Sequence, residues 1–120
     1  MKDERLYLIN ILDAIQRIES YTQDGKAVFM NTTLVQDAVI RNFEIIGEAT
    51  KRISQELRNP NPQVFWKLLA GFGDVLIHQY DRVDLEQVWT TVEADLPALK
   101  AQIVRLLNDL GGIEPIPPSD

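Results

Sequence analysis

The fold class of this chain is decided by the stretch Asp84-Leu-Glu-Gln-Val-Trp-Thr-Thr-Val-Glu-Ala-Asp-Leu-Pro-Ala-Leu-Lys-Ala-Gln-Ile-Val-Arg-Leu-Leu-Asn-Asp-Leu110. Apolar residues recur in it at intervals of three and four, which places them on one face of an α-helix. These residues are Leu85, Val88, Val92, Leu96, Leu99, Ile103, Leu106 and Leu110. Asp84 is a suitable N-cap, and Pro97 should kink the helix because proline lacks a backbone donor. The stretch therefore predicts one long amphipathic helix.

Three segments upstream show the same helical spacing, at about 3–22, 33–57 and 63–78. Asn59-Pro60-Asn61-Pro62 separates the second from the third, because proline disfavours helical geometry in the residue before it. Pro62 can in turn start the third helix. The apolar positions of the three segments are Leu8, Leu12, Ile15, Ile18, Val35, Val39, Ile46, Ala49, Ile53, Leu57, Phe65, Leu68, Leu69, Phe72, Val75 and Leu76.

The remaining segments complete an all-α architecture. Asp24-Gly25 ends the first helix, and Lys26 to Met30 has room for at most one helical turn. With no internal repeat and no alternating strand pattern, the sequence predicts a bundle of four long helices with a short extra turn. We expect residues 1–110 to form this domain. Residues 111–120, rich in Gly and Pro, are expected to be a flexible tail, with a partner-binding strap as the alternative.

Composition narrows the class of protein. A chain of 120 residues with 45% apolar and 25% charged residues is expected to be one soluble domain without a membrane span. No export signal is recognised at the N-terminus and no cysteine is present, so a cytoplasmic location is expected, and disulfides and thiolate metal sites are excluded. The formal charge of −6 argues against a surface that coats nucleic acid, although a local basic site stays possible.

The candidate chemistry lies between the last two helices, in the stretch 71–84. It contains the chain's one histidine, His78, whose imidazole can exchange protons near neutral pH. Tyr80 follows two positions later, and Asp74 lies one helical turn earlier. A purely structural role is the alternative, in which His78 interacts with the helix C-terminus or pairs with Asp74.

Three motifs in order resemble a known family. They are Leu69-Ala-Gly-Phe-Gly-Asp-Val-Leu-Ile-His-Gln-Tyr-Asp-Arg-Val-Asp84, Ile45-Ile-Gly-Glu-Ala-Thr-Lys-Arg-Ile53, and Val88-Trp89 ahead of Pro97. Together they are similar to the HepT-like HEPN-domain toxins of the HepT/MntA (HEPN/MNT) toxin–antitoxin systems. The resemblance covers nearly the whole chain and implies an HEPN-type helical bundle.

The resemblance also implies an activity, that of a metal-independent endoribonuclease which cuts tRNA or mRNA as a homodimer in a type VII-like system. The family pattern is Arg, four residues, His, one residue, Tyr, so His78 and Tyr80 match as catalytic residues while Gly73 stands where Arg is expected. No cofactor or metal is implied. Two copies of His78 across a two-fold axis would supply an acid and a base. Loss of the cation at Gly73 predicts an impaired copy, since one such stabiliser is commonly worth about 10²–10³ in rate.

Regulation follows from the same resemblance. The implied antitoxin is a MntA-type nucleotidyltransferase that transfers AMP to Tyr80, which adds negative charge where RNA phosphate would bind. Without the resemblance, Tyr80 would be read as a packing residue with a polar tip.

Several charged residues are possible supporting groups. Arg41 or Arg82 could replace the missing cation, and Glu44 and Glu48 could face the same cleft. A paired surface ladder is the alternative, because Arg41, Glu44, Glu48 and Arg52 lie three or four residues apart.

Two other functions remain open. A non-catalytic HEPN binding module that docks a nucleotidyltransferase is favoured by Gly73, whereas His78-Gln79-Tyr80 favours a nuclease lineage. A purely structural oligomerisation domain is the other hypothesis, and it predicts that no AMP is added to Tyr80.

Overall fold

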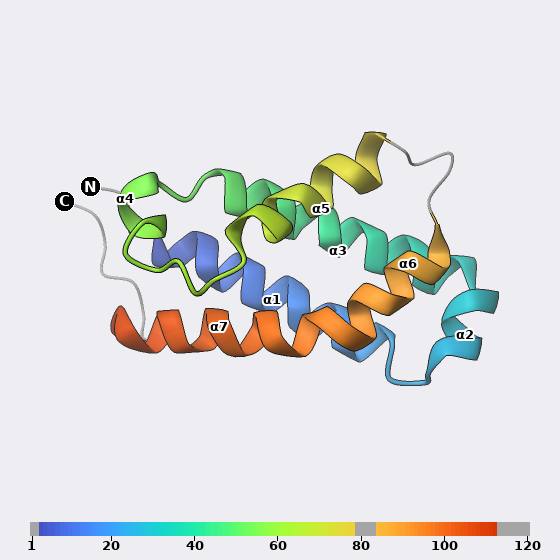
Figure 1. The fold of residues 1–120 in the computed structure, drawn as a ribbon. Coiled ribbons are helices and arrows are strands. Elements are labelled where there is room, and N and C mark those ends of the chain that lie inside the picture. Colours follow the sequence, from blue (N-terminus) through green and yellow to red (C-terminus); the bar gives the residue numbers. More distant parts are fainter. Residues whose placement is uncertain (1–2, 79–83, 113–120) are drawn as a thin grey trace.

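The computed structural model describes residues 3–78 and 84–112, with the backbone alone for positions 73–78 (Figure 1). All regular structure in these residues is helical, which confirms the all-α prediction. The elements are α1 (Arg5–Tyr21), α2 (Lys26–Asn31), α3 (Thr33–Lys51), α4 (Gln55–Arg58), α5 (Trp66–His78), α6 (Leu85–Thr90), the π-helical turn η2 (Thr91–Asp95) and α7 (Leu96–Asp109).

Four long rods form the bundle: α1, α3, α5, and α6 with α7. The colours of Figure 1 show that neighbours along the chain run in opposite directions, with α2 and α4 at opposite ends. Helix α3 packs against both α1 and α5, and α7 packs against α1. Among the described helices, none combines the length and the apolar composition that a membrane span requires.

The core is made by the apolar faces that the periodicity identifies. Leu8, Ile11, Ile15 and Ile18 of α1 are fully buried. On the far side of α3 the rings of Phe43 and Phe72 meet edge to face, with centroids 4.9 Å apart at 73°, the geometry that aromatic pairs prefer. Thus α3 joins the two halves of the core. Its other buried apolar residues are Val39, Ile46 and Ala49.

The second predicted helix is shorter than its apolar pattern suggests. It ends at Lys51, and Gln55–Arg58 forms a separate short helix, so the prediction of one helix over 33–57 is wrong. The cause is Ser54, whose backbone N–H and hydroxyl donate to the Glu4 carboxylate at 2.7 and 2.8 Å. Because that N–H is not available to α3, the chain turns, and the Ser54 hydroxyl caps α4 by accepting from the Leu57 N–H at 3.2 Å.

Helix α5 begins at Trp66 rather than at Gln63, so Pro62 is not its first residue. The residues before it are used in a turn, in which the Val64 N–H donates to the Asn61 carbonyl at 3.2 Å. The indole of Trp66 donates to the same carbonyl at 2.9 Å. The Phe65 N–H donates to the Gln102 side chain of α7 at 3.1 Å. A side chain distant in sequence thus fixes where α5 starts.

The last rod begins and bends as predicted. Asp84 caps α6, its carboxylate accepting from the N–H groups of Glu86 and Gln87 at 3.0 and 3.3 Å. A π turn precedes Pro97, in which the Leu96 N–H donates to the Thr91 carbonyl five residues back. Wider turns of this kind re-satisfy the backbone near a proline. Figure 1 shows α6 at an angle to α7.

Two glycines end the last rod. Gly111 and Gly112 have φ of 109° and 79°, a region that other residues rarely adopt. The Gly112 N–H donates to the Leu107 carbonyl at 2.7 Å and the Gly111 N–H to the Asn108 carbonyl at 3.3 Å, which is a Schellman motif. The predicted tail beyond these glycines lies outside the described residues.

Helix α2 closes one end of the bundle against α6. Gly25, with φ of 94°, starts it, as the predicted break requires. The rings of Phe29 and Trp89 lie 5.5 Å apart, and Lys26 Nζ lies 2.8 Å from Glu86 Oε2. The hydrogen bond to Glu86 raises the pKa of Lys26 above its ordinary value. An aromatic contact and an exposed ion pair therefore hold α2 to α6.

Candidate functional site

The candidate catalytic stretch occupies the end of α5 and the segment after it. Gly73 and Asp74 lie in the second half of α5, and His78 is its last residue. Tyr80 and Arg82 lie outside the described residues. The structure therefore gives the backbone position of His78. Tyr80 follows it by two residues in the sequence.

Helical register shows which side of α5 carries position 78. Leu69, nine residues earlier and fully buried, lies about half a turn away around the axis, at 3.6 residues per turn. Gly71, seven residues earlier, lies on the same side as position 78. A Cβ built at Gly71 meets no atom within 4 Å, so this side of α5 is open at Gly71. In register, position 78 thus shares its side of α5 with Gly71.

Three of the predicted supporting residues, Arg41, Glu44 and Glu48, lie on α3. Arg41 Nη1 lies 3.2 Å from Glu44 Oε2, so these two form the exposed pair that the ladder reading predicts. Arg41 also lines a hollow of about 190 Å³ between α1 and α3. The hollow is lined by Tyr7, Asn10, Arg41, Ile45, Glu48, Ala49 and Arg52.

This hollow faces a different direction from the contact between α3 and α5. Arg41 and Phe43 lie about 200° apart around α3, since each residue turns the helix by about 100°. Phe43 meets Phe72 of α5, whereas Arg41, Glu48 and Arg52 share a stripe that borders α1. The structure thus brings Arg41 and Glu48 together beside α1, and a role for them at His78 stays a prediction.

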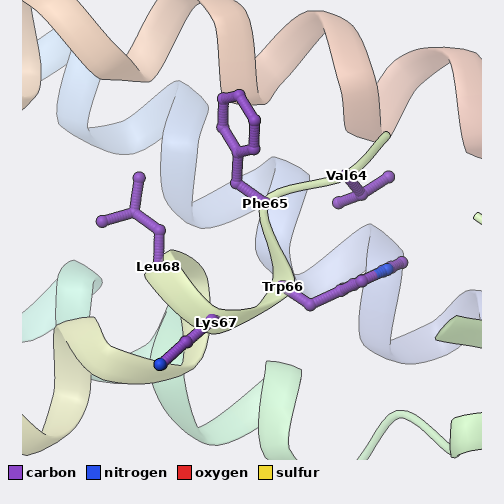
Figure 2. A pocket seen from close by; sticks show the side chains of 5 residues that line it. All are labelled: Val64, Phe65, Trp66, Lys67 and Leu68. Carbon is purple, nitrogen blue, oxygen red and sulfur yellow. The ribbon is translucent and has the colours of Figure 1, made fainter. Parts of the chain in front are cut away.

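A larger groove of about 720 Å³ lies at the start of α5, lined by Val64, Phe65, Trp66, Lys67 and Leu68. Phe65 is 52% exposed and Leu68 41%. Figure 2 shows the Phe65 ring pointing toward α7, with Leu68 on the neighbouring turn. Their spacing puts both in one stripe with Leu69 and Phe72, but only the latter two are buried.

The described part of the chain contains no group of three His, Cys, Asp or Glu residues placed to hold an ion. The residue type at position 78 suits proton transfer, because a histidine side chain ordinarily titrates near neutral pH.

Comparison with known proteins decides the family. Residues 11–106 match the HepT-like family, described as ribonuclease HepT-like. The chain belongs to the HepT-like family. The matched residues run from within α1 to within α7 and include every predicted site residue. The resemblance drawn from the three motifs is thereby confirmed.

Individual HepT-like relatives agree with this assignment. The chain is 42% identical over 110 residues to "Gamma-glutamylcyclotransferase and putative RNase MJ0434" of Methanocaldococcus jannaschii, covering 91% of this chain and 50% of that protein. It thus spans about half the length of that relative. It is 37% identical over 110 residues to "Putative RNase MJ0125" of the same organism, covering 91% of this chain and 95% of that protein. It is 40% identical over 101 residues to "Probable ribonuclease HepT" of Thermococcus cleftensis, covering 83% and 92%. No solved structure matches the chain significantly.

Sequence reasoning missed one part of this HepT-like chain, the contribution of α1 to the hollow. Tyr7 and Asn10 come from the first helix, and nothing in their spacing marks them as partners of α3. The regular placement of Arg41, Glu48 and Arg52 is the one signal in the sequence, and it indicates a shared face but not what lies opposite.

Proposed function

We propose that this HepT-like chain is the toxin of a toxin–antitoxin pair, an endoribonuclease that cuts tRNA or mRNA as a homodimer without a metal ion. The observation that carries the proposal is the position of His78, the one histidine of a ribonuclease-family chain, in the last turn of α5. This copy is impaired, because Gly73 offers no cation.

The chemistry follows from two imidazoles. One His78 removes the proton of a ribose 2′-hydroxyl, and the freed oxygen attacks the adjacent phosphorus. The bond from phosphorus to the 5′-oxygen breaks, and the second His78 gives that oxygen a proton, which leaves a 2′,3′-cyclic phosphate. A cation near the phosphorane stabilises its extra negative charge, and an arginine at position 73 would lie about 1.4 turns before the histidine.

Homodimerisation is supported by the surface of α5. Phe65 and Leu68 expose apolar side chains at its start, and Gly71 leaves open the side that position 78 shares. A second α5 packed along this helix would cover that surface and bring the two motif helices together. A single chain has one His78 and therefore lacks the second proton-transfer group.

Neutralisation is proposed to occur by AMP transfer to Tyr80 from a MntA-type nucleotidyltransferase. In the sequence Tyr80 follows the end of α5 by two residues, so the added phosphodiester would place negative charge beside the catalytic helix. That charge would repel the RNA phosphate.

The test is to restore the cation. Gly73→Arg is expected to cleave tRNA in EDTA about 10²–10³ times faster than the unaltered chain, the usual value of one transition-state cation. Adding His78→Ala to that variant should abolish the gain.

Gly71→Arg is the matched control, since it adds the same charge two residues away, at a position with open space. Equal activation by Gly71→Arg, or no activation by Gly73→Arg, would refute the nuclease proposal.

One observation favours a second function. Gly73 leaves the motif without its arginine, as expected of a HEPN module that docks a nucleotidyltransferase and performs no cleavage. In that case neither the unaltered chain nor Gly73→Arg cuts RNA, while the cognate transferase still binds the chain.

A further inference from the structure

The hollow between α1 and α3 has features that the proposed catalytic mechanism does not use. Arg41 and Glu48 lie on one stripe of α3, and Arg52, the C-cap residue, continues this stripe, which covers about three helical turns. Asn10 adds an exposed amide from α1, and Ile45 and Ala49 form an apolar floor. The result is a small concave surface with charged groups at both ends of one helix stripe.

Charge distinguishes this hollow from the rest of the surface. The chain as a whole carries a formal charge of −6, yet two arginines and one glutamate border the hollow. Arg41 is partly neutralised by Glu44 at 3.2 Å. The exposed Arg52 guanidinium has no hydrogen bond or ion pair with any residue that the structure describes. Arg52 is therefore ready to pair with an external anion.

The residue types match the parts of one nucleotide. Guanidinium groups bind phosphate oxygens through paired N–H donors. The Glu48 carboxylate is an acceptor that suits a ribose hydroxyl, and the floor of Ile45 and Ala49 suits the face of a base. At about 190 Å³ the hollow is smaller than pockets that enclose whole small molecules, so it fits one unit of a longer strand that lies on the surface.

We infer that this hollow is a substrate subsite that holds one nucleotide of single-stranded RNA, with Arg52 on a phosphate and Glu48 on the ribose 2′-hydroxyl. The inference rests on the proposed ribonuclease function and adds to it a contact away from the motif helix. Arg52 is a substrate-binding residue in this account, and it takes no part in proton transfer.

The experiment measures binding of a short fluorescein-labelled single-stranded RNA to the full chain in EDTA over a series of KCl concentrations. Arg52→Gln is expected to weaken binding about tenfold, the loss of one charge-assisted hydrogen bond. It should also reduce the slope of log affinity against log salt by about 0.7, the value of one phosphate contact on a single strand.

Arg105→Gln is the matched control, since it removes the same charge from an exposed site on α7 and should leave the slope unchanged. Equal slopes for Arg52→Gln and Arg105→Gln would overturn the inference even if Gly73→Arg proves active. A specific loss with Arg52→Gln beside an inactive Gly73→Arg would support the subsite and refute the nuclease. Absence of RNA binding by the unaltered chain would overturn both.

Glu48→Gln tests the sugar contact separately, with DNA of the same sequence as the second probe. The preference for RNA over DNA is expected to fall in this variant, because the acceptor for the 2′-hydroxyl is weakened. An unchanged RNA-to-DNA ratio would remove Glu48 from the subsite.

Discussion

Helices α3 and α5 use their apolar residues differently. On α3 the large core residues Phe43 and Ile46 are fully buried, and charged residues occupy the opposite side. On α5 Leu69 is fully buried, but Leu68 next to it is 41% exposed, and Phe65 ahead of the helix is 52% exposed. Leu34 in the first turn of α3 is 79% exposed, but from Val39 onward the fold of one chain accounts for the large apolar residues of α3. At the start of α5, Phe65 and Leu68 together leave apolar surface that this fold does not cover, and such neighbouring exposed residues suit contact with a partner.

The largest expected effect is on the contact that joins the two helices. Phe43→Ala removes a ring that is 1% exposed and packs edge to face on Phe72. We expect the free energy of unfolding to fall by about 3–5 kcal/mol, the range for a buried phenylalanine. Urea denaturation followed by circular dichroism measures it.

Leu34→Ala is the matched control on α3, because Leu34 is 79% exposed. Its effect should stay within about 0.5 kcal/mol, as for ordinary surface substitutions. If both variants lose the same stability, α3 is not divided into a core side and a solvent side.

The positions of the helices could be predicted from local pattern, but two of their ends could not. Periodicity places α1, α3, α5 and the last rod because each helix buries its own apolar face. The end of α3 depends on Glu4, which lies 50 residues from Ser54 in the chain. The start of α5 depends on Gln102, 37 residues after Phe65. Contacts of this length require the folded arrangement, and no local signal carries them.

The residues of the candidate site likewise differ in whether the sequence alone could point to them. His78, Tyr80 and Gly73 could be proposed as site residues from the sequence alone, because they lie in one short motif that resembles the family shown by the comparisons. The hollow beside α1 could not, because Asn10 meets the α3 stripe only after the two helices pack. Packing also decides that Leu68 is exposed while its neighbour Leu69 is buried.

The second largest expected effect is on the proposed homodimer. Replacing Phe65 and Leu68 together by Ser removes the exposed apolar surface at the start of α5, so we expect the proposed dimer to dissociate to monomers. Because Phe65 is 52% and Leu68 41% exposed, neither side chain is part of the buried core, and the fold should remain intact. Sedimentation velocity measures the change, with circular dichroism as the check on folding.

Leu6→Ser is the control for this pair, since Leu6 of α1 is 44% exposed and lies on another helix. A dimer that survives the double change on α5 but is lost with Leu6→Ser would move the interface to α1. A chain that is monomeric before any change would refute the composite site of two histidines.

The smallest expected effect lies at the α2 end, where α6 is tied by a surface pair. Lys26 Nζ donates to Glu86 Oε2 at 2.8 Å, and this hydrogen bond raises the pKa of Lys26. A raised pKa in the folded state means that the pair stabilises the fold fully below the ordinary lysine pKa and ceases to do so as pH rises through the raised value. Glu86→Gln should therefore lower the melting temperature slightly at neutral pH, with the difference vanishing at strongly alkaline pH.

Asp13→Asn, at another exposed carboxylate, is the control, and its melting temperature should not approach that of the unaltered chain as the pH rises. NMR titration of the Lys26 side chain provides the direct measurement, because its pKa should return toward the ordinary value in Glu86→Gln. An unchanged pKa would mean that Phe29 on Trp89, at 5.5 Å, holds α2 without help from the ion pair.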